Sequence, residues 1–151
     1  MPPSRKLPEP PPPVLACARV LHYAVVDSVV RFAGRTLLFV DGKELSQVPR
    51  LVICEERERS EALLFHCTAD WDILGCSAHK SVAKAKAHAE TIYHGVATRW
   101  VDADVSEQTA DAYLDELFGA RRCNVCDRRA DKVNRLIQND SGAWVCDECA
   151  G

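Results

Sequence analysis

Four cysteines near the end of the chain have the residue type and spacing of a metal site. Cys123 and Cys126 form one C-x-x-C pair, and Cys146 and Cys149 form a second pair. Nineteen residues lie between Cys126 and Cys146. Each pair turns two thiolates to one side of a knuckle, so two pairs supply four sulfurs to a tetrahedral Zn²⁺. Four protein ligands leave no open coordination position, which predicts one structural zinc per chain. A rubredoxin-like iron site and a redox-active disulfide pair are the alternatives.

The flanking residues give this stretch mixed charge. Six basic side chains surround the cysteines in the sequence: Arg121, Arg122, Arg128, Arg129, Lys132 and Arg135. They would offset the two net negative charges of a zinc–tetrathiolate centre, or form a small basic face. A basic face suits nucleic acid, so nucleic-acid binding through the five arginines is an alternative function. Four acidic side chains in and just after the two C-x-x-C motifs oppose it: Asp127, Asp131, Asp147 and Glu148.

Residues 123–149, CNVCDRRADKVNRLIQNDSGAWVCDEC, resemble the N-terminal zinc-binding domain of the Clp protease unfoldase ClpX. The features shared besides the cysteines are Val133, Leu136, Ile137, Trp144 and Val145. The resemblance implies a treble-clef-like zinc module with a short hairpin. In that family the module dimerises and docks adaptors and substrates, which implies protein dimerisation or unfolded-protein binding here.

Three features depart from the family pattern. Asp127 stands where the family usually has glycine after the second cysteine, and the turn 139–142 replaces a Gly-Pro turn. We expect the helix that follows the last cysteine in the family to be missing, because the sequence stops at Gly151. A G-x-x-x-x-G-K-[ST] loop is absent from the sequence, so we expect no unfoldase ATPase in it.

Three segments follow from composition and pattern. Residues 1–13 hold seven of the eight prolines and are predicted to be a disordered proline-rich tail. Residues 14–118 are predicted to form an α+β domain of unknown role. Residues 119–151 are the zinc module, which is too small for an independent core and would take on the order of 10 kcal/mol of folding free energy from zinc.

Short apolar runs and turn signals predict the elements of the 14–118 domain. Strands are expected at 20–26, 29–32, 36–40, 51–54, 63–67, 71–76 and 96–101. Two helices are expected, one at 82–94 capped by Ser81 and one at 107–118 capped by Ser106. The fold class is therefore α+β, an antiparallel sheet with two helices on one face, followed by the zinc module.

The remaining cysteines and histidines of that domain could either bind a metal or catalyse a reaction, or simply be buried in its core. Cys17, Cys54, Cys67 and Cys76 are expected to be reduced core thiols. Adjacent strand residues point to opposite faces, so His66 and Cys67 would not chelate one metal together. The third functional hypothesis is an enzyme built on this domain, in which Cys67 or Cys76 acts as the nucleophile and a histidine accepts its proton. Since no local signature supports it, we expect no enzyme and no catalytic residues.

These observations predict a cytoplasmic, zinc-binding protein-interaction protein. The long acidic segment 14–118 carries eleven basic and sixteen acidic residues, which disfavours a nucleic-acid partner. No apolar run is long enough for a membrane span or a signal peptide, so we expect neither membrane nor secretion. The partner would be another protein or a second copy, docking on Val133, Leu136, Ile137 and Trp144.

Overall fold

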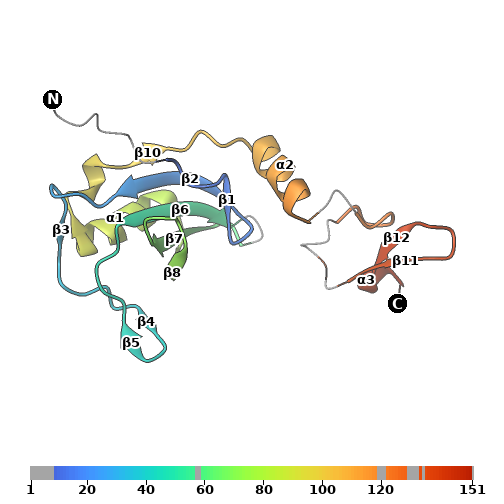
Figure 1. Ribbon diagram of the computed structural model, residues 1–151, viewed down its shortest axis with the longest axis horizontal. Coiled ribbons are helices and arrows are strands. Elements are labelled where there is room, and N and C mark those ends of the chain that lie inside the picture. The colour runs from blue at the N-terminus through green and yellow to red at the C-terminus, as the bar shows by residue number, and fades with distance from the viewer. Residues whose placement is uncertain (1–8, 57–58, 119–121, 129–132, 134, 151) are drawn as a thin grey trace. The chain divides into compact units, whose positions relative to one another are not determined.

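The computed structural model describes residues 9–56, 59–118, 122–128, 133 and 135–150. The chain divides into two compact units, Met1–Val105 and Ser106–Gly151 (Figure 1). This division precedes the helix 107–118, whereas the predicted domain limit follows it. Compactness does not establish which segment folds on its own, so the limits 14–118 and 119–151 stay a prediction.

The first unit is built on one antiparallel sheet. Its strand order is β1-β2-β6-β7-β8, and β10 pairs with β2 alongside β1. The strands are β1 Val14–Leu15, β2 Ala18–Val25, β6 Arg50–Glu56, β7 Glu61–Cys67, β8 Ile73–His79 and β10 Val101–Asp102. The apolar run Leu51–Cys54 lies in central strand β6 and is fully buried, as expected of a strand covered on both faces.

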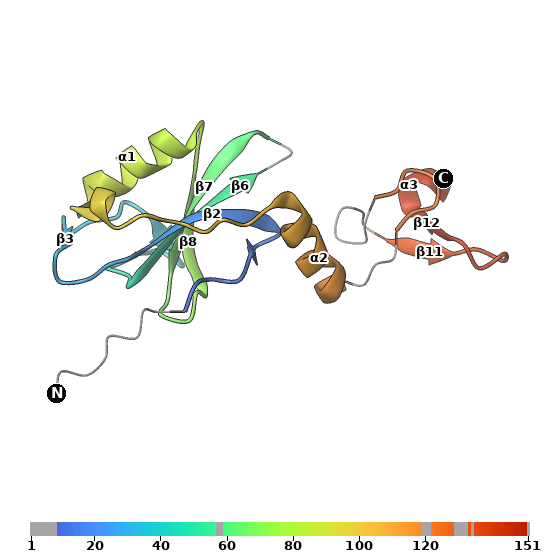
Figure 2. The same ribbon diagram turned by 90° about the horizontal axis from the view of Figure 1, so that it is seen from above.

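Helix α1 (Val82–Ile92) covers one face of this sheet, as Figure 2 shows. Ser81 begins the helix, because its hydroxyl accepts a hydrogen bond from the Lys84 amide at 3.1 Å. Ala85 and Ala89 are completely buried, and such small side chains let the helix approach the sheet closely. The core on this side includes Leu51, Ile53 and Leu64 from the sheet, with Tyr93 and Val96 from the segment after the helix.

The opposite face carries a second core, and among the described residues of this unit no helix covers it. Val52, Cys54, Phe65 and Cys67 project there, and Trp71 packs against them. The expected second helix, α2 (Glu107–Phe118), belongs to the other compact unit. The antiparallel α+β architecture is therefore confirmed, with α1 as the helix that covers the sheet.

The segment after α1 differs from expectation. Residues 96–101 were predicted to be a strand, but Val96–Thr98 form the 3-10 helix η1 and only Val101–Asp102 pair with the sheet. Gly95 has φ +96°, and the Glu90 carboxylate accepts hydrogen bonds from the Gly95 and Ala97 amides at 2.8 and 3.0 Å. This side-chain cap favours a helical turn over a strand, and the apolar pattern alone did not indicate it. Two further short strands, β3 (Arg31–Phe32) and β9 (Tyr93–His94), pair at this end.

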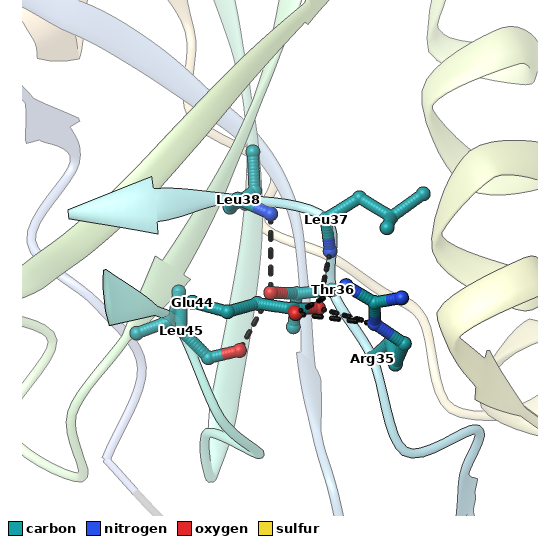
Figure 3. Close-up of polar contacts among 6 residues, drawn as sticks. All are labelled: Arg35, Thr36, Leu37, Leu38, Glu44 and Leu45. Carbon is teal, nitrogen blue, oxygen red and sulfur yellow. Dashed lines mark hydrogen bonds and ion pairs between the residues drawn. The ribbon is translucent and has the colours of Figure 1, made fainter. Parts of the chain in front are cut away.

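Residues 35–45 form a projecting hairpin that we call the arm. Strands β4 (Phe39–Val40) and β5 (Lys43–Glu44) are joined by Asp41 and Gly42, both at positive φ, as a two-residue hairpin turn requires. The base of the arm is closed by side chains, as Figure 3 shows. The Glu44 carboxylate accepts from the Arg35 guanidinium at 2.9 Å and from the Leu37 amide at 3.1 Å. The Thr36 hydroxyl donates to the Leu45 carbonyl at 2.6 Å.

The second unit holds helix α2, a hairpin and a short terminal helix. The Ser106 hydroxyl accepts from the Thr109 amide at 3.0 Å, which confirms it as the cap of α2. The hairpin strands are β11 (Leu136–Gln138) and β12 (Trp144–Cys146), and α3 (Asp147–Ala150) follows directly. Among the described residues, helices are either too short or too polar to cross a lipid bilayer.

Candidate metal centre

The structure brings together the four cysteines singled out in the sequence. The sulfur atoms of Cys123, Cys126, Cys146 and Cys149 all lie within 4.8 Å of one another. A tetrahedral zinc with Zn–S bonds of about 2.3 Å requires sulfurs about 3.8 Å apart. The Cys126 and Cys146 sulfurs are 3.7 Å apart, so the donor set fits this metal in both chemistry and geometry.

The first C-x-x-C pair is held by a tight knuckle. The Cys123 amide donates to the Arg128 carbonyl at 2.9 Å, and the Asp127 amide donates to the Cys123 carbonyl at 2.8 Å. The Val125 amide also points at the Cys123 sulfur, 3.4 Å away. Asp127 takes φ +59°, a left-handed conformation that glycine adopts without strain and that Asp tolerates better than most residues. The backbone conformation at this position is therefore one that favours glycine.

The second pair is delivered by the hairpin and α3. Cys146 is the last residue of β12 and lies opposite Leu136. Helix α3 begins directly after it, at Asp147, and contains Cys149. The Asn139 side-chain oxygen accepts from the Ser141 and Ala143 amides at 3.0 and 2.9 Å, which fixes the hairpin turn. A knuckle, a hairpin and a helix that carries the last ligand form the treble-clef-like arrangement that the family resemblance implied.

Arg128 connects the two pairs through its guanidinium. Its Nε lies 3.2 Å from the Cys126 sulfur and its Nη2 lies 3.8 Å from the Cys146 sulfur. The same Nη2 donates to the Glu148 carboxylate at 2.6 Å. One cation thus contacts sulfurs from both knuckles, where it stabilises the negative charge of thiolates. The pattern of basic residues suggested such a role for the group but did not identify Arg128.

The surroundings shift the pKa values of the thiols in opposite directions. Backbone amides of the knuckles that hydrogen-bond the Cys123 sulfur lower its pKa to about 6, and the Arg128 guanidinium lowers the pKa of Cys126. The hydrogen bond of the Cys149 thiol to the Cys146 sulfur raises the pKa of Cys149 to about 12. Zinc binds thiolates, so its binding must displace the remaining thiol protons from this cluster.

The other sequence candidates are not brought together. Within the described ranges, the four cysteines are the one group of three or more possible ligands close enough to hold a metal. His66 faces the α1 side of the sheet and Cys67 the other side, as predicted. Burial raises the pKa of Cys67 to about 12, which disfavours a nucleophilic thiolate there. The prediction of four core thiols is wrong for Cys17 and Cys76, which are exposed.

The predicted apolar docking surface divides into two faces. Cross-strand partners share a face and adjacent residues do not, so Leu136 lies with Cys146 while Ile137 lies with Val145. Ile137 is 42% exposed, whereas Val133, Leu136 and Trp144 are partly buried. The prediction of one surface containing all four residues is therefore wrong, because Ile137 lies on the face opposite to Leu136 and Trp144. Ile137 and Leu136 are adjacent on β11, so their side chains point to opposite faces of the hairpin.

Val125 is an exposed apolar residue that the sequence reasoning missed. It lies inside the first C-x-x-C knuckle and is 70% exposed. The neighbouring Asn124 amide donates to the Trp144 carbonyl at 2.7 Å, which attaches the knuckle to β12. The sequence could have predicted this exposure, because an apolar residue between two metal ligands of a tight knuckle has no hydrophobic core to pack into.

The described arginines of this region are largely paired. Arg122 lies 3.5 Å from the Asp115 carboxylate, and Arg128 contacts Glu148 and the sulfurs. Arg135 is exposed, and its amide points at the Asp147 carboxylate at 3.4 Å. Arg121, Arg129, Lys132 and Asp131 lie outside the described residues.

Comparison with known proteins agrees with this geometry. Residues 121–151 match the family model described as the ClpX C4-type zinc finger, and the segment before them has no recognised family. No solved structure matches the chain. The match and the sulfur cluster together show a C4 zinc module that binds one Zn²⁺.

Proposed function

We propose that the zinc module docks apolar segments of another polypeptide, either an adaptor or an unfolded client. The observation that carries this proposal is the outward face of the hairpin, where Ile137 and Val145 stand opposite each other. Val125 adds a second exposed apolar side chain from the knuckle bonded to β12. Exposed apolar side chains on a small rigid module are typical of a protein-interaction surface.

The metal supports a structural role in this function. Bound zinc supplies a rigid cross-link between the knuckle and the hairpin, and four sulfur ligands leave no position for a substrate. Zinc binding requires all four cysteines to be reduced, which suits a reducing compartment such as the cytoplasm. We therefore expect loss of zinc to abolish docking by unfolding the surface.

Protein is favoured over nucleic acid because of the charge pairing around the centre. Arg122 and Arg128 already contact carboxylates, and a cation so engaged neutralises a phosphate less effectively. Arg135 remains as an exposed cation among the described residues of the hairpin. Salt-dependent binding of single-stranded RNA that is lost in Arg135→Gln would support the nucleic-acid alternative instead.

The test uses the zinc-loaded full chain and a fluorescently labelled, permanently unfolded polypeptide. We expect Ile137→Glu to weaken binding about tenfold or more in an anisotropy titration, because it places a charge on the apolar face. Gln138→Glu is the matched control, since it adds the same charge to the other face of the same strand. Both variants must keep one zinc per chain. Equal affinity of Ile137→Glu and the wild type would overturn the proposal.

A further inference from the structure

Strand β8 leaves one edge of the main sheet open. Among the described residues its backbone pairs with β7 on one side, with a register shift at Leu74, and no hydrogen bond is formed on the other. The strand has seven residues, Ile-Leu-Gly-Cys-Ser-Ala-His, with no proline, lysine, arginine, aspartate or glutamate. Proteins normally protect such an edge with charge, proline or a covering segment, because an open edge pairs with another strand.

The arm places exposed apolar side chains beside this edge. A Cβ on Gly75 would lie 3.0 Å from Leu45 Cδ2 and 3.5 Å from Leu38 Cδ1, so the arm rests on β8 where the strand has no side chain. Leu37 and Phe39 of the arm are 67% and 63% exposed. Glu44 and its hydrogen bonds hold the arm in this shape (Figure 3), so little conformational entropy is lost when a partner binds.

The charges that flank β8 are arranged symmetrically about its centre. Cys76 is the middle residue of Ile73–His79, and its side chain is exposed. Asp72 precedes the strand by one residue and Lys80 follows it by one residue, so each lies four positions from Cys76. Both are exposed. The register shift at Leu74 lies between Asp72 and this centre, so in an antiparallel pair centred on Cys76 the Asp72 of each copy lies near Lys80 of the other rather than directly opposite it.

We propose that β8 pairs antiparallel with β8 of a second copy, centred on Cys76, so that two sheets become one. A neutral strand with opposite charges at its two ends is complementary to its own antiparallel copy, which selects this chain as the partner. Gly75 then lies opposite Ser77 of the partner subunit, and Ile73 and Leu74 lie near His79 and Ala78 of the partner subunit. The exposed residues of the arm provide apolar contacts next to the seam.

The first test is a cross-link at the centre of the seam. Directly opposite residues of an antiparallel pair have Cα atoms about 4.5–5.5 Å apart, within the range of a disulfide. With oxidised glutathione, two Cys76 thiols form one disulfide and the glutathione disulfide is reduced to two thiols. We expect a covalent dimer whose linked peptides contain Cys76 on both sides. Cys17→Ser, which removes another exposed thiol, must leave this product unchanged, and Cys76→Ser must remove it.

The second test reverses the flanking charges without using a thiol. Native mass spectrometry should show a dimer of the zinc-loaded chain, with a Kd about tenfold or more higher in Lys80→Asp, because carboxylates then face each other. The double variant Asp72→Lys with Lys80→Asp restores the opposite-charge pairs and should recover the dimer. A monomer at 100 µM, on the order of ordinary assay concentrations, or a double variant as weak as the single one, overturns the proposal.

Dimerisation through the zinc module gives a different result. Cys146→Ser removes one zinc ligand in the second compact unit and leaves β8 unaltered. We expect this variant to remain dimeric and to form the Cys76 cross-link. A dimer that is lost together with zinc assigns the contact to the module, which overturns pairing through β8 and leaves client docking by the module to be judged by its own titration.

Discussion

Arg128 is the side chain on which the charge balance of the zinc centre most directly depends. Its guanidinium contacts the Cys126 and Cys146 sulfurs and the Glu148 carboxylate, so it joins ligands from both knuckles. Residues that orient or neutralise metal ligands affect how firmly the metal is held, even though they do not coordinate it. The sequence showed basic residues near the cysteines, but only the geometry distinguishes this one from the others.

Replacement of Arg128 should make the zinc more labile. We expect Arg128→Gln to bind one zinc but to lose it to a chromogenic chelator about tenfold faster, since the thiolates lose their cationic partner. The rate is measured by chelator absorbance, with Arg135→Gln as the control that removes a cation without a sulfur contact. Identical release rates for Arg128→Gln and the wild type would show that the guanidinium contributes nothing to zinc retention.

His66 makes the first unit sensitive to acid. The side chain is fully buried, and neither ring nitrogen has a hydrogen-bond partner among the described residues. Burial lowers the pKa of His66 to about 4 from 6.5. The unfolded chain therefore binds a proton more readily between pH 6.5 and 4, so the free energy of unfolding falls as the pH falls through that window.

The expected loss is roughly 2 kcal/mol between pH 7.5 and 5, measured by urea unfolding of the first unit. His66→Phe removes the titrating group from the same site. Its absolute stability can change because the ring is larger, but its loss on acidification should be smaller by about the same amount. If the variant and the wild type lose equal stability, His66 is not the group responsible.

Some properties of single residues could be predicted from the sequence and others could not. The four ligands were predictable because C-x-x-C spacing is a local geometric requirement. The strain at Asp127 was visible only as a departure from a glycine, and its φ of +59° gives the physical reason. The exposure of Cys76 was not predictable, because it depends on β8 lying at the edge of the sheet, and Cys17 is exposed because it lies in the turn between β1 and β2.

Among the elements, the arm shows how side chains shape a short hairpin. The sequence predicted its turn at Asp41–Gly42, since few other dipeptides accept two positive φ angles. The sequence could not predict that Gly75 of β8 receives the arm, because that contact joins distant parts of the chain. The Glu44 contact at the base is local, but the apolar pattern does not show which backbone amide a carboxylate will accept from. The strand predicted at 96–101 failed for the same reason, since the carboxylate of Glu90, five residues before Gly95, stabilises a helical turn there.

Loss of the Glu44 carboxylate should loosen the arm. Hydrogen bonds from the Arg35 guanidinium lower the pKa of Glu44, so the contact is present above its ordinary range and is lost as the pH falls through the lowered value. We expect Glu44→Gln to increase hydrogen exchange of the Leu37 amide severalfold at neutral pH, because that amide donates to the carboxylate. The neighbouring Lys43→Gln, which lies on the same strand, should leave the exchange rate unchanged.

For the whole molecule, the two compact units should respond differently to metal removal. The first unit has two apolar cores of its own, whereas the zinc module is too small to fold without a cross-link. We expect chelation to unfold the hairpin β11–β12 and leave the sheet intact. Amide spectra would show this as collapse of the Gln138 and Cys146 signals with retention of Leu51 and Leu64. Loss of all four signals together would mean that the units fold as one.

The ends of the first unit lie next to each other. The Val20 amide donates to the Pro13 carbonyl at 3.0 Å, and the Ala103 amide donates to the Leu21 carbonyl at 3.0 Å, so the incoming and outgoing chains bond to consecutive residues of β2. A unit with adjacent ends can be inserted into a loop of another protein without distortion of its host. The same adjacency permits circular permutation, with the original ends joined by a short linker and new ends opened at Asp41–Gly42.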